Sequence, residues 1–133
     1  MVSAALAFPP SNGQRRRVLL VEDDESIREA FADLLEFEGY DLCATGDGEA
    51  ALTLIATGSV PDVILLDMMM PLMDGHTFLR RLQEQGGGGR IPVVVVSATQ
   101  QERPPNVVAF IRKPFEPAFL LDLLAKLFAG KPS

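Results

Sequence analysis

Four apolar segments of this chain each lead into side chains that can take part in acid, base or phosphate chemistry. The segments are short and rich in branched aliphatic residues, which is typical of strands buried on both faces of a parallel sheet. Because ligands bind at the carboxyl edge of such sheets, the polar side chains are expected to form one site. The segments are 18–21 before Glu22 and Asp23, 63–66 before Asp67, 93–96 before Ser97, and 107–111 shortly before Lys113.

Three of these side chains are carboxylates, and carboxylates that lie close together repel one another. One of them would take up a proton unless a cation compensated the charge. A hard divalent ion held by few carboxylates and by water suits Mg²⁺, which can neutralise phosphoryl oxygens. An acidic cluster, a metal and a lysine are sufficient for phosphoryl transfer. Asp67 is then the predicted nucleophile, Lys113 the partner of one phosphate oxygen, and Ser97 a hydroxyl donor to another.

Helical patterns separate the strands. Apolar residues at offsets of three, four, seven and eight follow Asp24, a predicted helix cap, and Gly39 ends that helix. The other predicted helices are 48–56, capped by Asp47, 75–85, and one that starts at Pro117. The predicted strands are 17–22, 41–45, 60–66, 91–96 and 107–111.

The alternation of strands and helices predicts an α/β fold with a parallel sheet and right-handed crossovers. Five strands in this length indicate a flavodoxin-like doubly wound sheet with strand order 2-1-3-4-5. In that order the first and third strands are neighbours. Glu22 and Asp23 are therefore expected to converge on Asp67.

The connection between the fourth and fifth strands is short. Eight residues, 99–106, are left for it, and two of them are Pro104 and Pro105. A βαβ crossover with its helix usually needs at least ~10–12 residues. The fourth crossover helix is therefore predicted to be shortened or absent.

The whole chain has the size and composition of one globular domain. Its 133 residues are 47% hydrophobic, and no apolar run reaches the roughly 20 residues that span a membrane. The net charge of −6 argues against direct binding to nucleic acid. Cys43 is the single cysteine, which fits a cytoplasmic protein. The expected organisation is a flexible tail over 1–14, a domain over 15–129 and a tail over 130–133.

The motifs together resemble the receiver domain of two-component response regulators. They are Val-Glu-Asp-Asp at 21–24, Leu-Asp-Met-Met-Met-Pro-Leu-Met-Asp-Gly at 66–75, Ser-Ala at 97–98 and Lys-Pro-Phe at 113–115. The resemblance implies that Asp67 accepts a phosphoryl group with Mg²⁺ bound. It also implies a donor, which is a sensor histidine kinase or a histidine phosphotransfer protein, and a downstream protein target.

The resemblance also assigns roles to single residues. Glu22 and Asp23 match the acid pair on the metal, and the backbone carbonyl of Met69 matches a further metal ligand. Ser97 and Lys113 match the pair that senses the phosphoryl group, and Phe110 matches the switch aromatic. A cis bond before Pro114 and a phosphorylation-dependent homodimer are family features. Such a domain catalyses its own phosphorylation and dephosphorylation and is not a turnover enzyme.

Several alternatives stay open at this stage. The chain could be a pseudo-receiver, an interaction module that never carries phosphate, because its fourth crossover is altered. A flavin- or nucleotide-binding protein of the same fold is disfavoured, since the acids after the first strand repel phosphate. Phe110 could be plain core. Glu22 is longer than the commoner aspartate at its position and could reach the metal through a water.

Overall fold

The computed structural model describes residues 6–10, 13, 15–85, 91–98, 104 and 106–129. Strands and helices alternate along these residues except between the last two strands. The strands are β1 (Arg17–Val21), β2 (Asp41–Thr45), β3 (Val63–Leu66), β4 (Val93–Ser97) and β5 (Ala109–Arg112). The helices are α1 (Glu25–Phe37), α2 (Gly48–Ala56), α3 (Gly75–Glu84) and α4 (Pro117–Ala129).

The five strands form one parallel sheet in the order β2-β1-β3-β4-β5, as the sequence predicts. The register places Val21 beside Leu66, so β1 and β3 end side by side. It also pairs Ser97 with Arg112, so β4 ends beside the last residue of β5. The strand ends that carry the predicted site residues therefore meet at one edge of the sheet.

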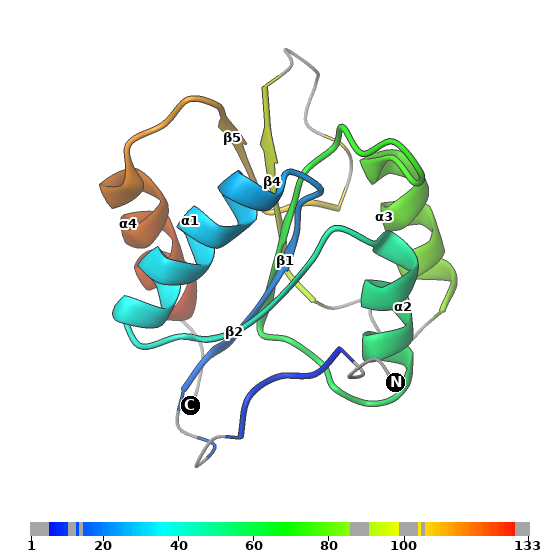
Figure 1. Cartoon of the computed structure of the whole chain (residues 1–133), viewed down its shortest axis with the longest axis horizontal. Coiled ribbons are helices and arrows are strands. Elements are labelled where there is room, and N and C mark those ends of the chain that lie inside the picture. The colour runs from blue at the N-terminus through cyan, green and yellow to red at the C-terminus, as the bar shows by residue number, and fades with distance from the viewer. Residues whose placement is uncertain are drawn as a thin grey trace.

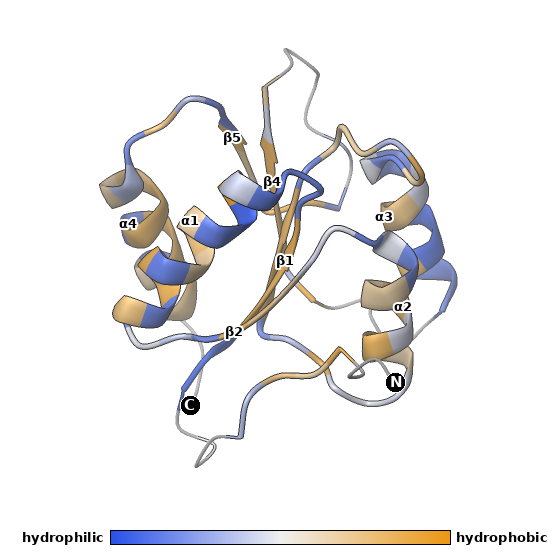
Figure 2. Ribbon diagram, viewed as in Figure 1, coloured by the Kyte–Doolittle hydropathy of each residue, from blue (hydrophilic) through white to orange (hydrophobic). Residues whose placement is uncertain are grey.

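Helices cover both faces of the sheet (Figure 1). α1 and α4 lie on one face, and α2 and α3 lie on the other. Successive strand residues point to opposite faces, so Leu19 and Val21 join the core under α2 and α3, while Val18 and Leu20 join the core under α1 and α4. Figure 2 shows the strands as the hydrophobic centre between two helical layers whose outer faces carry many hydrophilic residues.

Carboxylates cap three of the four helices. Asp24 accepts a hydrogen bond from the backbone N–H of Ile27, and Asp74 accepts one from Thr77. Asp47 caps α2 through the N–H of Glu49. These contacts confirm the predicted helix starts, because a cap satisfies a backbone donor that the helix leaves free. None of the helices in the described ranges is long and apolar enough to cross a membrane.

Four strands differ from their predicted bounds by one to three residues. β1 ends at Val21 instead of 22. β3 starts at Val63 instead of 60, because Pro61 has no N–H for a ladder. β4 starts at Val93, after Pro92, for the same reason. β5 starts at Ala109 instead of 107, since Asn106 has a positive φ of 70° and the chain is still turning there.

The connection from β4 to β5 has no helix in the part that the structure describes. Ala98, Pro104 and residues 106–108 are in turns or irregular backbone. Residues 99–103 and 105, which make up most of the predicted irregular segment, lie outside the described residues. Within the described residues the fold therefore keeps the five-stranded sheet of the prediction and has four helices.

Part of the predicted N-terminal tail packs against the domain. Leu6 and Phe8 contact the core cluster under α2 and α3, and the guanidinium of Arg17 lies 5.0 Å from the centre of the Phe8 ring. A cation over an aromatic face is attractive at this distance. Leu6 and Phe8 therefore add to the folded unit, and the domain boundary at residue 15 stays a prediction.

The burial of two phenylalanines predicts a large effect on stability at one position and almost none at the other. Phe78, on α3, is 0% exposed, whereas Phe37, at the end of α1, is 86% exposed. Phe78→Ala is expected to lower the free energy of unfolding by about 3–5 kcal/mol, because it removes buried apolar surface and leaves a cavity. The matched control Phe37→Ala should change it by no more than about 0.5 kcal/mol. Urea denaturation of both variants measures the difference, and equal losses would show that this side of the core is assigned wrongly.

Candidate functional site

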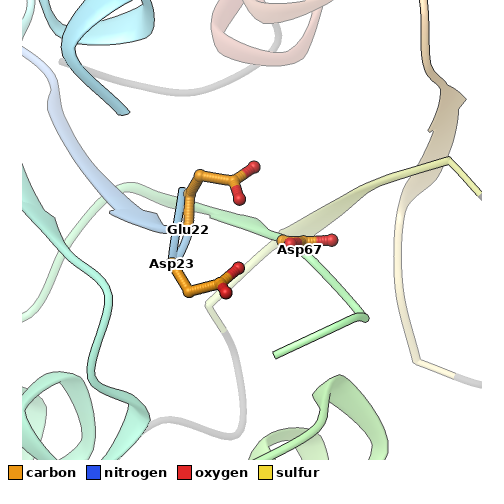
Figure 3. Close-up of side chains that lie close together, drawn as sticks. All are labelled: Glu22, Asp23 and Asp67. Atoms are coloured by element: carbon orange, nitrogen blue, oxygen red, sulfur yellow. The ribbon is translucent and has the colours of Figure 1, made fainter. Parts of the chain in front are cut away.

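The ends of β1 and β3 bring three carboxylates together. The N–H of Asp67 donates to the carbonyl of Val21 (3.0 Å), so the chain past β3 stays bound to the end of β1. Glu22, Asp23 and Asp67 each offer one carboxylate oxygen, and these oxygens all lie within 4.8 Å of one another. Figure 3 shows Glu22 and Asp23 leaving the end of β1 toward the side on which Asp67 lies. The structure thus brings together the acid cluster that the sequence predicts.

Burial sets these carboxylates apart from ordinary surface acids. Glu22 is 2% exposed and Asp67 is 6% exposed, whereas Asp23 is open to solvent. Desolvation raises the pKa of Asp67 from 3.8 to about 6. The N–H of Met69 opposes this shift by donating to Asp67, the carboxylate of Glu22 adds to it, and Lys113 lowers the pKa again. Without a bound cation, Asp67 is thus protonated in a fraction of the molecules near pH 6.

Lys113 is paired with Glu22. Its ammonium Nζ lies 2.7 Å from Oε1 of Glu22, and both side chains are mostly buried. The other oxygen of Glu22 accepts a hydrogen bond from the N–H of Asp24 (3.2 Å). The longer side chain of glutamate therefore reaches across to the end of β5. The sequence also predicts that Glu22 could reach a metal through a water molecule, and this stays a prediction.

Ser97 and Lys113 lie next to each other at the ends of β4 and β5. The backbone N–H of Lys113 donates to the carbonyl of Ser97 (2.9 Å), and Ser97 is fully buried. The peptide bond between Lys113 and Pro114 is cis, as the resemblance implies. The short crossover has not displaced this pair from the site, although its own path lies mostly outside the described residues.

Met69 and Phe110 occupy the positions that the sequence predicts, but their roles stay predictions. The N–H of Met69 donates to Oδ1 of Asp67 (3.1 Å), which orients the carboxylate, and its side chain is 55% exposed. Phe110 is partly buried and packs against the core under α2 and α3, so it is a core residue in this conformation.

Gly75 holds the loop after Asp67 close to α3. Its N–H donates to the carbonyl of Met68 (3.1 Å), and a Cβ at this position would lie 2.8 Å from Cα of Met68. Since real Cβ atoms do not approach backbone so closely, only glycine fits here. The predicted helix start at residue 75 is confirmed, because α3 begins at Gly75 after its cap Asp74.

Arg28 contacts the site and was not predicted. Its NH1 group donates to the carbonyl oxygen of Glu22 (2.8 Å) and to that of Asp23 (3.3 Å). The only sequence signal is its place one helical turn after Asp24, the cap that directly follows the acid pair. Such a position lets a long side chain fold back over the turn.

An apolar groove adjoins Lys113. Its volume is about 570 Å³, and it lies between α1 and the loop that joins β5 to α4. Ala30, Phe31 and Leu34 line one side, and Pro114, Phe115 and Pro117 line the other. The groove is thus a hydrophobic surface next to the acid cluster.

The donor set of the cluster fits a hard divalent cation. All three ligand candidates are carboxylates, and hard cations such as Mg²⁺ prefer oxygen ligands. Burial, and after it the charge of Glu22, raises the pKa of Asp67, so a bound cation would favour the ionised form of this carboxyl. Glu22, Asp23 and Asp67 are therefore the residues that could hold such an ion.

The pKa of Asp67 predicts a pH-dependent effect of its removal. A folded-state pKa raised from 3.8 to about 6 means that folding opposes ionisation of this acid. In EDTA, Asp67→Asn is therefore expected to raise the thermal midpoint at pH 7.5. This gain should be complete above about pH 6 and should vanish as the pH falls toward 3.8, where Asp67 is protonated in both states.

Thermal unfolding followed by circular dichroism between pH 4 and pH 8 measures this gain. Asp33→Asn, an exposed carboxylate on α1, is the matched control and should give a small effect without this profile. A gain that grows toward low pH would contradict the raised pKa of Asp67.

Comparison with known proteins gives relatives of both sequence and structure. The family model described as response regulator receiver domain matches residues 18–125. The response regulators MprA of Mycolicibacterium vanbaalenii and of Mycobacterium tuberculosis are each 37% identical over 119 residues. These matches cover 85% of this chain but 49% of the relatives, so the chain spans about half the length of the curated relatives it matches.

Solved structures agree with the sequence matches. The chemotaxis protein CheY4 of Vibrio cholerae superposes with a TM-score of 0.74 at 29% identity, covering 84% of this chain and 98% of that one. The receiver domain of the sensor histidine kinase PA1611 of Pseudomonas aeruginosa, with a magnesium ion coordinated in its active site cleft, gives a TM-score of 0.77 at 27% identity and covers 87% and 99%. With the sheet order, the acid cluster and the Lys113 position in place, the chain belongs to the response regulator receiver domain family.

Proposed function

We propose that this domain is the phosphoacceptor switch of a two-component phosphorelay, and that Asp67 accepts the phosphoryl group in the presence of Mg²⁺. The observation that carries this function is the meeting of Glu22, Asp23 and Asp67 within 4.8 Å, with Lys113 2.7 Å from Glu22. Phosphoryl transfer depends on positioning and charge stabilisation, and these four side chains supply both. Membership of the receiver family supports the same conclusion.

The chain's own residues perform the transfer as follows. An oxygen of Asp67 attacks the phosphorus of a phosphohistidine, a P–O bond forms, the P–N bond breaks, and the histidine leaves with a proton. The N–H of Met69, which already donates to Asp67 at 3.1 Å, holds the attacking carboxylate in place. A bound Mg²⁺ on Glu22 and Asp23 would supply positive charge for the phosphoryl oxygens.

Lys113 and Ser97 are the proposed partners of the phosphoryl group once it is on Asp67. Lys113 carries a compact positive charge on a flexible stem, so it can turn from Glu22 to a phosphoryl oxygen. The Ser97 hydroxyl, buried at the end of β4, would donate to another oxygen. The new negative charge can then bias the loops after β4 and β5, with Phe110 as the proposed moving aromatic.

The partner that donates phosphate is proposed to be a sensor histidine kinase or a histidine phosphotransfer protein. It must place a histidine beside Asp67, and the apolar groove between α1 and the β5–α4 loop offers it a contact surface next to Lys113. Such a partner would place the domain in the cytoplasm. A downstream protein target and a phosphorylation-dependent homodimer also belong to this proposal.

A second candidate function is a pseudo-receiver that binds partners without carrying phosphate. Two observations favour it: Lys113 is engaged by Glu22, and the described part of the β4–β5 connection has no helix. The intact acceptor, acid pair and lysine argue against it. Chemical phosphorylation decides between the two.

The first functional prediction concerns the acceptor itself. Incubation with acetyl phosphate or phosphoramidate and Mg²⁺ is expected to add the mass of one phosphoryl group, and Asp67→Asn should abolish this addition because the amide cannot form the acyl phosphate. Intact-protein mass spectrometry measures it, with Asp33→Asn as the matched control that keeps the addition. An unmodified wild-type protein would favour the pseudo-receiver.

The second functional prediction concerns the groove. Ala30→Arg places a charged side chain on the apolar surface of α1, and burying that charge under a partner is costly. Phosphotransfer from a donor protein that phosphorylates the wild type should slow at least tenfold, while the rate with acetyl phosphate stays within twofold. Radiolabelled transfer assays measure both rates. Ala56→Arg, on an exposed position of α2, is the control; equal slowing by both variants would exclude the groove as the docking surface.

A further inference from the structure

Arg28 binds the backbone of both predicted metal-binding acids at the end of β1. The same NH1 group donates to the carbonyl oxygens of Glu22 and Asp23, at 2.8 Å and 3.3 Å. These residues follow the last strand residue, Val21, so their carbonyls lie where the sheet ladder ends. A guanidinium donor makes stronger hydrogen bonds than a neutral group would.

The carboxylates on the turn that Arg28 holds are repelled by Asp67. These two carboxylates face Asp67 with oxygens within 4.8 Å, and Glu22 is almost fully buried. Like charges this close push the turn away from β3. The hydrogen bonds of Arg28 act on the peptide groups of the same two residues, and so they oppose this displacement.

Gly46 leaves the space that Arg28 needs. A Cβ at this position, in the turn between β2 and α2, would lie 2.9 Å from NH1 of Arg28 and 3.1 Å from Cα of Asp23. The absence of a side chain at Gly46 thus lets the two turns and the guanidinium pack in direct contact. The N–H of Glu22 also donates to the carbonyl of Thr45 (2.9 Å), just before this glycine.

We propose that Arg28 is a positioning residue for divalent-ion binding: it fixes the peptide groups of Glu22 and Asp23 so that their carboxylates face Asp67. This role rests on the proposed function, in which the acid pair holds Mg²⁺. Arg28 does not touch the phosphoryl group in this scheme. It acts only through the acids whose backbone it binds.

A positioning role and a simple charge effect predict opposite results. Arg28 is a cation bound to the backbone of two of the three acids, so by Coulomb's law alone its removal would strengthen the binding of Mg²⁺. If it positions the acid pair, its removal weakens binding in spite of the more negative site. The sign of the change therefore identifies the role.

Titration of Mg²⁺ by isothermal calorimetry tests this sign in three variants that circular dichroism shows to be folded. Arg28→Met keeps much of the side-chain length without a donor and is expected to raise the Kd at least fivefold. Arg28→Lys keeps the charge and one donor group, so its Kd should lie between those of the wild type and Arg28→Met, at least twofold above the wild type. The control Arg81→Met removes an arginine paired with Glu49 on the α2–α3 surface and should stay within twofold.

Phosphorylation by acetyl phosphate gives a second readout. In Arg28→Met the Mg²⁺ concentration for half-maximal rate should rise at least fivefold, while the rate at saturating Mg²⁺ recovers to within twofold of the wild type. General damage to the domain would lower the saturated rate instead.

Three outcomes overturn the role of Arg28. The first is Mg²⁺ binding by Arg28→Met that is as tight as, or tighter than, that of the wild type, and the second is a lowered saturated rate in Arg28→Met with an unchanged half-saturating Mg²⁺ concentration. If Arg28→Met does not fold, the third is wild-type Mg²⁺ affinity in Arg28→Lys. A wild-type protein that binds no Mg²⁺ is a different result, which overturns the proposed function. The two failures are thus distinguishable.

Discussion

The structure depends on holding three carboxylates together at the edge of a hydrophobic sheet. At a separation of ~4 Å, two like charges repel by roughly 4 kcal/mol at the effective dielectric constant of a protein surface. The sheet opposes this repulsion with the β1–β3 pairing, in which Val21 lies beside Leu66. The acids are thus close because the apolar strands beneath them are fixed.

Positive charge and backbone donors compensate the cluster in part. Lys113 pairs with Glu22, the N–H of Met69 donates to Asp67, and Arg28 binds the carbonyls of the acid pair. The compensation is incomplete, since burial, together with the charge of Glu22, still raises the pKa of Asp67 to about 6. A site with this residual charge is suited to a divalent cation, which connects the energetics of the fold to the proposed chemistry.

Glu22 has two roles: it pairs with Lys113, and in the proposed function it helps to hold the metal. In the conformation described, Glu22 holds Lys113, while the proposed function needs Glu22 near the metal and Lys113 near the phosphoryl group. The long, flexible side chains at both positions make such an exchange of partners sterically simple. Phosphorylation would then rearrange an ion pair that already exists, which links the site to the loop after β5.

The sequence by itself determined the sheet order, the helix caps and the acid cluster. Apolar segments that end in Glu22, Asp67 and Ser97 have one simple arrangement in a parallel sheet, and capping aspartates such as Asp24 act on residues within one helical turn. The eight residues 99–106 are likewise too few for a full fourth crossover helix, and the described part of this connection has none.

Only the tertiary structure decided which groups share a partner. Lys113 and Glu22 are 91 positions apart, and their pairing depends on how far a glutamate reaches across the sheet edge. The contact of Arg28 with two carbonyls, the packing of Leu6 and Phe8, and the groove between α1 and the β5–α4 loop depend on side-chain directions and on the close approach of turns. Periodicity and motif spacing carry no information on these, because they record positions along the chain and not distances between elements.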